Sequence, residues 1–141
     1  MNYQVNVEDK IKESGKNLIT VTQLRLLLSN TSIVKNKIEM EKNEKGRNGY
    51  EISEDIKNDI KYLLIRHIYQ CGREDKVFRF DKNFKISEGI RSIKSEKDFF
   101  IFYRYLEEIV AYMKYYEQLH EIEKNQYRSN DSQKNRNHNR R

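Results

Sequence analysis

The sequence contains no proline or tryptophan, a single cysteine, Cys71, and only five glycines among 141 residues. Because proline is the residue that most often ends or kinks a helix, its absence favours long helices. One cysteine excludes a disulfide within the chain and is typical of a reducing compartment. No run of residues is long and apolar enough to cross a membrane, and the first residues lack the basic start and apolar run of a secretion signal. We therefore expect a cytoplasmic protein with no membrane attachment.

Charge is abundant but unevenly distributed. Charged residues make up 35% of the sequence, and the formal net charge is +6. Residues 126–141 hold five Lys/Arg and one Asp, whereas residues 1–125 are nearly neutral. We expect one helical domain over residues 1–125 and a basic, disordered tail over residues 126–141. The tail could add loose affinity for nucleic acid, or it could serve only to keep the protein in solution.

Two helices have clear start signals. Thr20 followed by Gln23 has the form of a capping box, which predicts a helix from this point to about Met40. Ser53 is placed to cap a second helix, because acidic residues follow it directly and favour the positive end of the helix dipole. Gly72 is expected to end this second helix as a left-handed cap.

The remaining segments are also expected to be helical. Residues 1–19 have the pattern of a loose lead-in or a short helix, and residues 75–93 that of two short helices broken near residues 87–89. The longest helix is expected from Ser95 to about residue 125, with two adjacent apolar stripes. A helix that is apolar over so wide an arc lies at the centre of a bundle or is shared with another molecule. The fold class is therefore all-α, a compact bundle of about five helices with a long C-terminal helix.

The sequence offers little to an enzyme. His67 lies in an apolar stripe and is expected to be a hydrogen-bonded core residue. His120 could meet Glu123, but a single His–Glu pair is no catalytic constellation, and His138 lies in the tail. One cysteine and scattered histidines give no zinc spacing, and Cys71 on the core face is expected to be buried and unreactive. Gly-rich phosphate loops and nucleophile elbows are absent from the sequence. We expect no catalytic site, no cofactor and no metal.

Binding is the function class that remains, and one helix face suggests it. Tyr62, Arg66, Tyr69 and Arg73 are spaced by four, three and four residues, so they lie along one side of the second helix, opposite its apolar stripe. Arginine can hold a phosphate with two hydrogen bonds, and tyrosine can stack on an unpaired base. The same residues could instead pack under neighbouring helices with cation–π contacts, or form a protein interface. Spacing alone leaves the three interpretations open.

The positions of other basic residues also allow more than one interpretation. Lys57 and Lys61 form a pair one turn apart at the edge of the apolar stripe, and Arg25 stands alone among leucines. Such side chains extend toward solvent or find a partner. A carboxylate and a phosphate would both satisfy them.

Three blocks, taken in order, resemble a known family. They are "TVTQLRLLLSNTS" (residues 20–32), "IKYLLIRHIYQCGRE" (residues 60–74) and "FFIFYRYLEEIVAYMKYYE" (residues 99–117). The pattern resembles the small subunit of the type III-A CRISPR effector, the Csm complex. The resemblance covers nearly the whole chain except the first residues and the tail, and its most specific parts are "YLxxRxxYQxGRE" and "YLEEIVAYxKYY".

The resemblance implies a non-catalytic subunit that acts in antiviral defence. It implies several copies stacked head to tail along the groove where guide RNA and target RNA pair, beside the other subunits of the Csm complex. Basic residues would contact the RNA backbone, and the matching positions are Arg25, Lys61, Arg66 and Arg73, to which helix geometry adds Lys57. The alternative is a helical interaction or scaffold module without direct RNA contact.

Overall fold

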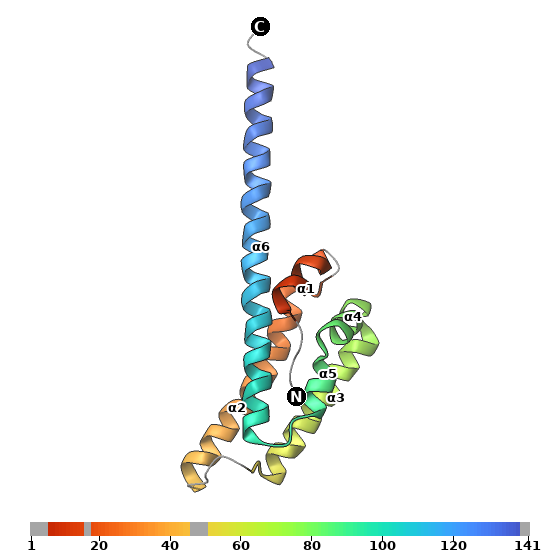
Figure 1. Cartoon of the computed structure of the whole chain (residues 1–141), viewed down its shortest axis with the longest axis vertical. Helices are drawn as coiled ribbons and strands as arrows, with labels where there is room; N and C mark the ends of the chain where they lie inside the picture. Colours follow the sequence, from red (N-terminus) through yellow and green to blue (C-terminus); the bar gives the residue numbers. More distant parts are fainter. Residues whose placement is uncertain (1–5, 16–17, 46–50, 139–141) are drawn as a thin grey trace.

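Six helices and no strand make up the part of the chain that the structure describes, residues 6–15, 18–45 and 51–138 of a computed structural model (Figure 1). In chain order they are α1 (Val7–Ser14), α2 (Val21–Lys45), α3 (Glu54–Arg73), α4 (Asp75–Phe84), α5 (Ile86–Arg91) and α6 (Glu96–His138). The predicted all-α class is confirmed. Residues 1–19 were expected to be a loose lead-in or a short helix, and their described part contains the short helix α1. No helix in the described ranges is apolar over a length that could cross a membrane.

The predicted helix starts are confirmed by their hydrogen bonds. The backbone N–H of Thr20 donates to Gln23 Oε1 at 2.9 Å, and the N–H of Gln23 donates to Thr20 Oγ1 at 3.1 Å. This is the reciprocal pair of a capping box. Ser53 Oγ accepts the N–H of Ile56 at 3.3 Å, which caps α3.

Three predicted helix ends were wrong, the first being that of α2, which continues to Lys45 instead of ending at about Met40. Gly72 is not a left-handed cap, because α3 continues through Arg73 and the chain turns at Glu74 in an extended conformation, directly before α4. The break between α4 and α5 lies at Lys85 (φ 57°, ψ 44°) rather than at residues 87–89. Lys85 is the one described non-glycine residue with positive φ. The break occurs there because Phe84 and Ile86 are both fully buried, and a left-handed residue between them turns both toward the core.

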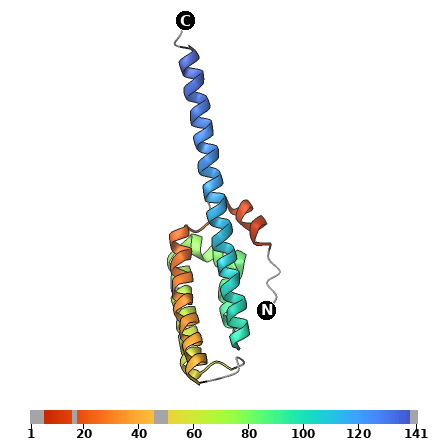
Figure 2. The same cartoon turned by 90° about the vertical axis from the view of Figure 1, so that its left-hand side faces the viewer.

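The helices pack in a simple order around α6. Its first half lies beside α2 and α1, while α2 also contacts α3, and α3 contacts α4 and α5 (Figures 1 and 2). The centre of the core consists of completely buried side chains from five helices: Leu24, Ile56, Phe84, Ile86, Phe99, Phe102, Leu106 and Ile109. The stripes predicted for α2 and α3 and the first stripe of α6 lie mainly in the core. Of the second predicted stripe of α6, Tyr105 is buried, whereas Ile101 is 39% exposed.

The last helix extends well beyond the bundle. It spans 43 residues, which corresponds to roughly 65 Å, and every described side chain after Leu119 is exposed (Figure 1). The expectation of disorder from residue 126 differs from the structure, in which α6 continues to His138. Nothing in the sequence after Ser95 stops a helix, since this stretch has neither proline nor glycine. Residues 139–141 of the expected tail lie outside the described part.

Tyrosine hydroxyls tie α6 to its neighbours. Tyr105 is buried, and its hydroxyl donates to the carbonyl oxygen of Phe84 at 2.6 Å, at the end of α4. Tyr116 donates to Glu8 Oε1 at 2.6 Å and so holds α1 against α6. These bonds fix the rotation of α6 relative to the elements beside it.

The core half and the extended half of α6 should respond differently to truncation. Leu106→Ala is expected to lower the free energy of unfolding by about 2–5 kcal/mol, because it leaves a cavity in a fully buried site. Ile122→Ala in the extension should change it by no more than about 0.5 kcal/mol. Urea unfolding followed by circular dichroism measures both, and a large loss at Ile122 would contradict a free-standing extension.

The Tyr105 hydroxyl offers a second test with a matched control. Tyr105→Phe is expected to cost about 1–2 kcal/mol of unfolding free energy, because it removes the buried bond to Phe84. Tyr115→Phe on the same helix should be neutral, since Tyr115 is 60% exposed. Equal effects in thermal unfolding would mean that the buried bond does not hold α6 in place.

Candidate nucleic-acid interface

The tyrosine and arginine stripe on α3 faces solvent. Tyr62 is 56% exposed and Tyr69 is 65% exposed, so neither ring packs under a neighbouring helix. The Arg66 guanidinium lies over the Tyr62 ring, 4.6 Å from its centroid, in a cation–π contact. The cation–π contact was expected if these side chains packed within the fold. The exposure of both tyrosine rings instead leaves them accessible to a binding partner.

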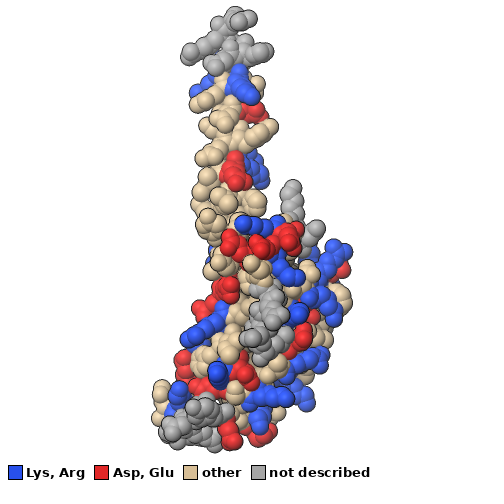
Figure 3. Space-filling model, in the orientation of Figure 1, with Lys and Arg blue, Asp and Glu red and all other residues tan. Residues whose placement is uncertain are grey.

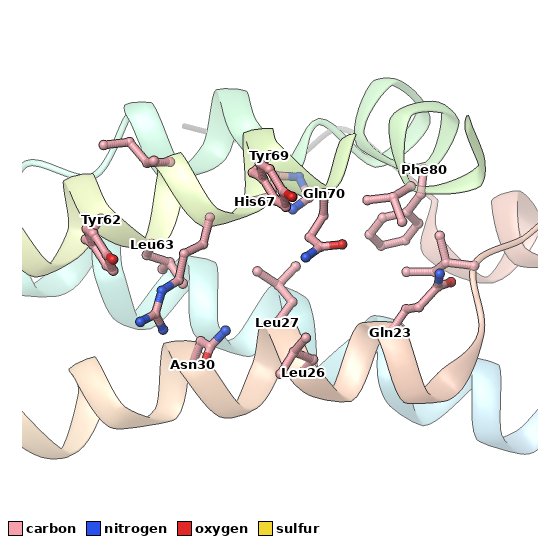
Figure 4. Close-up of a pocket in the computed structure, with 14 residues that line it drawn as sticks. Gln23, Leu26, Leu27, Asn30, Tyr62, Leu63, His67, Tyr69, Gln70 and Phe80 are labelled. Atoms are coloured by element: carbon pink, nitrogen blue, oxygen red, sulfur yellow. The ribbon is translucent and has the colours of Figure 1, made fainter. Parts of the chain in front are cut away.

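This stripe borders a groove between α2 and α3 (Figure 4). The groove has a volume of about 500 Å³. Leu26, Leu27 and Asn30 of α2 face Leu63 and Gln70 of α3 across it (Figure 4). Tyr62, Arg66 and Tyr69 also line the groove, which combines apolar walls with a positive charge at its edge.

The other predicted basic residues lie elsewhere on the surface. Lys57 and Lys61 are exposed on α3, but at 100° per residue they lie about 120–180° around the helix from Arg66 and Arg73. Arg25 is exposed on α2, about 140° around that helix from the groove residue Asn30. The five predicted residues are therefore all at the surface, but they form at least two separate basic faces.

Sequence reasoning missed a basic surface on α4 and α5. Lys and Arg side chains gather over α3, α4 and α5, on the right of Figure 3. Those that residues 75–94 contribute are all exposed: Lys76, Arg79, Lys82, Lys85, Arg91 and Lys94. The same range has only three acidic residues, of which Asp81 is buried. The signal available in the sequence was the excess of six basic over three acidic residues in this range.

Most of the predicted cations are not held by internal carboxylates. Within the described residues, Arg25, Lys61 and Arg73 have no acidic partner within 4.0 Å. Lys57 Nζ lies 3.3 Å from Glu54 Oε1 in an exposed pair one turn apart. Exposed pairs of this kind are weak and exchange readily with a stronger anion.

A buried polar cluster joins α3 to α4. His67 Nε2 lies 2.8 Å from Asp81 Oδ1 and 3.5 Å from Cys71 Sγ. Burial alone would raise the pKa of Asp81, but hydrogen bonds from His67 and from the Ser87 N–H and hydroxyl outweigh it and hold that pKa below its ordinary value. Asp81 was not singled out from the sequence, because its partners come from two other helices.

This cluster is not built as a nucleophilic relay. Such a relay needs the nucleophile and the carboxylate at opposite nitrogens of the imidazole, whereas Cys71 and Asp81 both meet Nε2. Burial, with the charge of Asp81, raises the pKa of the Cys71 thiol to about 11. A thiol with that pKa is almost entirely protonated at neutral pH.

Comparison with known proteins gives a consistent match. The family model "Csm2 Type III-A" covers residues 3–119, which end where the side chains of α6 become exposed. The "CRISPR system Cms protein Csm2" of Mycobacterium tuberculosis strain H37Rv is 36% identical over 105 residues, 74% of this chain and 79% of the relative. The protein of the same name from Streptococcus thermophilus is 32% identical over 102 residues, 72% of this chain and 76% of the relative.

The range that the family model matches, residues 3–119, includes the three sequence blocks and all five predicted basic positions. The chain therefore belongs to the Csm2 family of type III-A CRISPR systems.

Proposed function

We propose that this protein is a non-catalytic small subunit of a type III-A CRISPR ribonucleoprotein that contacts the RNA backbone through exposed basic residues. In this role several copies stack along the groove where guide RNA and target RNA pair, among the other subunits of the complex. The single observation that carries the RNA contact is the exposure of Arg25, Lys61 and Arg73, which have no acidic partner among the described residues.

The charge distribution supports contact with phosphates rather than with bases. The basic side chains are exposed on α3 and over α4 and α5. Contacts from such surfaces reach sugar-phosphate groups, which carry no sequence information. That property suits an assembly in which base pairing between guide and target reads the sequence.

Repetition of the subunit would compensate for weak individual contacts. The net charge is only +6 over 141 residues, and exposed ion pairs contribute little singly. Copies held side by side convert later contacts into intramolecular ones and so raise the affinity for one RNA. The isolated chain is then a weak binder, and the assembled complex a strong one.

A second candidate function has its own supporting observation. The groove between α2 and α3 is lined by exposed apolar residues such as Leu26 and Ile65, 55% and 53% exposed. Exposed apolar surface of this kind is typical of protein contacts. In this version the chain is an interaction module, and the complex meets RNA through other subunits.

Paired substitutions in the assembled complex separate the two functions. Arg66→Ala with Arg73→Ala, and separately Lys57→Ala with Lys61→Ala, are expected to weaken target RNA binding about five- to thirtyfold, which corresponds to about 1–2 kcal/mol. Subunit composition should stay unchanged. Filter binding with labelled RNA and native mass spectrometry measure the two quantities.

The control is Lys97→Ala with Lys114→Ala, which removes the same charge from exposed positions on α6. It should leave RNA binding within twofold of the unaltered complex. If the variants on α3 instead break assembly while intact complexes keep their RNA affinity, the interaction module is the correct function. An equal loss of RNA affinity in the control would mean that the α3 variants act only through the change in net charge.

A further inference from the structure

From the buried cluster we infer a site for a transition-metal dication of the zinc type, with His67, Cys71 and Asp81 as its ligands. The inference stands apart from the proposed RNA contact and concerns the opposite, inward side of α3. These three residues are the group among the described residues whose donor atoms all lie within 4.8 Å of one another. Imidazole nitrogen, thiolate sulfur and carboxylate oxygen are the ligand types that zinc takes in proteins.

The helices place the three donors without distortion. His67 and Cys71 are four residues apart on α3, so they lie on the same side of that helix. Asp81 comes from α4, which crosses this side. A bound ion would therefore join two helices that are linked in sequence only by Glu74.

The distance between the sulfur and nitrogen donors agrees with tetrahedral coordination. Zinc bonds of about 2.3 Å to sulfur and about 2.0–2.1 Å to nitrogen hold those two atoms about 3.5 Å apart. Cys71 Sγ and His67 Nε2 are 3.5 Å apart. Asp81 Oδ1 is 2.8 Å from the same nitrogen, so it would have to withdraw by about 0.5 Å to make room for the ion.

Hydrogen bonds from Ser87 already orient the Asp81 carboxylate. The Ser87 backbone N–H donates to Asp81 Oδ1 at 2.7 Å, and the Ser87 hydroxyl donates to Oδ2 at 2.8 Å. Hydrogen bonds of this kind to a ligating carboxylate fix its direction toward a metal. They come from the first turn of α5, so a third helix would support the site.

Charge and access also favour a dication. One carboxylate and one thiolate neutralise a charge of +2, which keeps the cost of burying the ion low. Metal binding would displace the thiol proton of Cys71 to solvent, along with any proton on His67 Nε2. Of the three ligands, His67 also lines the groove between α2 and α3, so the groove is the side from which an ion would approach.

Without an ion the same three side chains hydrogen-bond to one another, and a purely hydrogen-bonded lock is the competing account. Cobalt(II) distinguishes them, because a thiolate ligand gives it an intense near-ultraviolet charge-transfer band. Since Cys71 is the one cysteine of the chain, that band would report this site alone.

The full chain, stripped with a chelator and kept reduced without added thiol, is titrated with cobalt(II) and then with zinc(II). We expect a thiolate-to-cobalt band that saturates at one ion per chain and is abolished by excess zinc. A titration without the band overturns the site, and so does a band that does not saturate at one equivalent. This measurement uses the unaltered protein, so it does not depend on whether a variant folds.

Two variants locate the ion. Cys71→Ala removes one sulfur atom and should abolish the band and the rise in melting temperature that zinc gives to the unaltered chain. Asp81→Asn should weaken zinc affinity roughly tenfold or more while the thiol stays in place. The matched control is His120→Ala. It removes an exposed imidazole that lies 3.8 Å from Glu123, a pair that could hold zinc at the surface. Zinc stabilisation that survives Cys71→Ala, or that is lost in His120→Ala, would place the ion at the surface and refute the site.

Discussion

The burial of one side of α6 is the constraint on which the bundle depends. Its first half carries Phe99, Phe102, Leu106 and Ile109, which are all completely buried. α2 and α1 cover it along its length, while Tyr105 reaches the end of α4. After Leu119 every described side chain of α6 is exposed, and the helix continues without packing against the bundle.

Because apolar residues fill the interior, charged residues are confined to the helix surfaces. The pairs that do form there, such as Lys37 with Asp59 at 2.7 Å, join neighbouring helices or neighbouring turns. Among the described residues, Arg25 of α2 and Lys61 and Arg73 of α3 have no acidic partner, and further exposed basic side chains lie over α4 and α5. A bundle that is nearly neutral in sum can therefore still present basic faces to a polyanion.

The sequence was most informative where local chemistry decides the structure. The capping box at Thr20, the cap at Ser53 and the main apolar stripe of each long helix follow from spacing, and these were predicted correctly. The helix break at Lys85 could not be placed, because it depends on core positions for the residues on either side. The cluster at Asp81 could not be predicted either, since it requires three helices to meet. The RNA-contacting role of the basic residues stays a prediction, and the structure adds that they occupy more than one face.

The central claim is that exposed cations of this chain meet RNA phosphates, and salt dependence tests it most directly. The affinity of the chain for a single-stranded RNA without base preference is measured by fluorescence anisotropy over a range of salt concentrations. With two to four phosphate contacts per copy, log affinity should fall against log salt with a slope between about −1.4 and −2.8. An affinity that does not change with salt would contradict direct phosphate contact, and with it the proposed role on RNA.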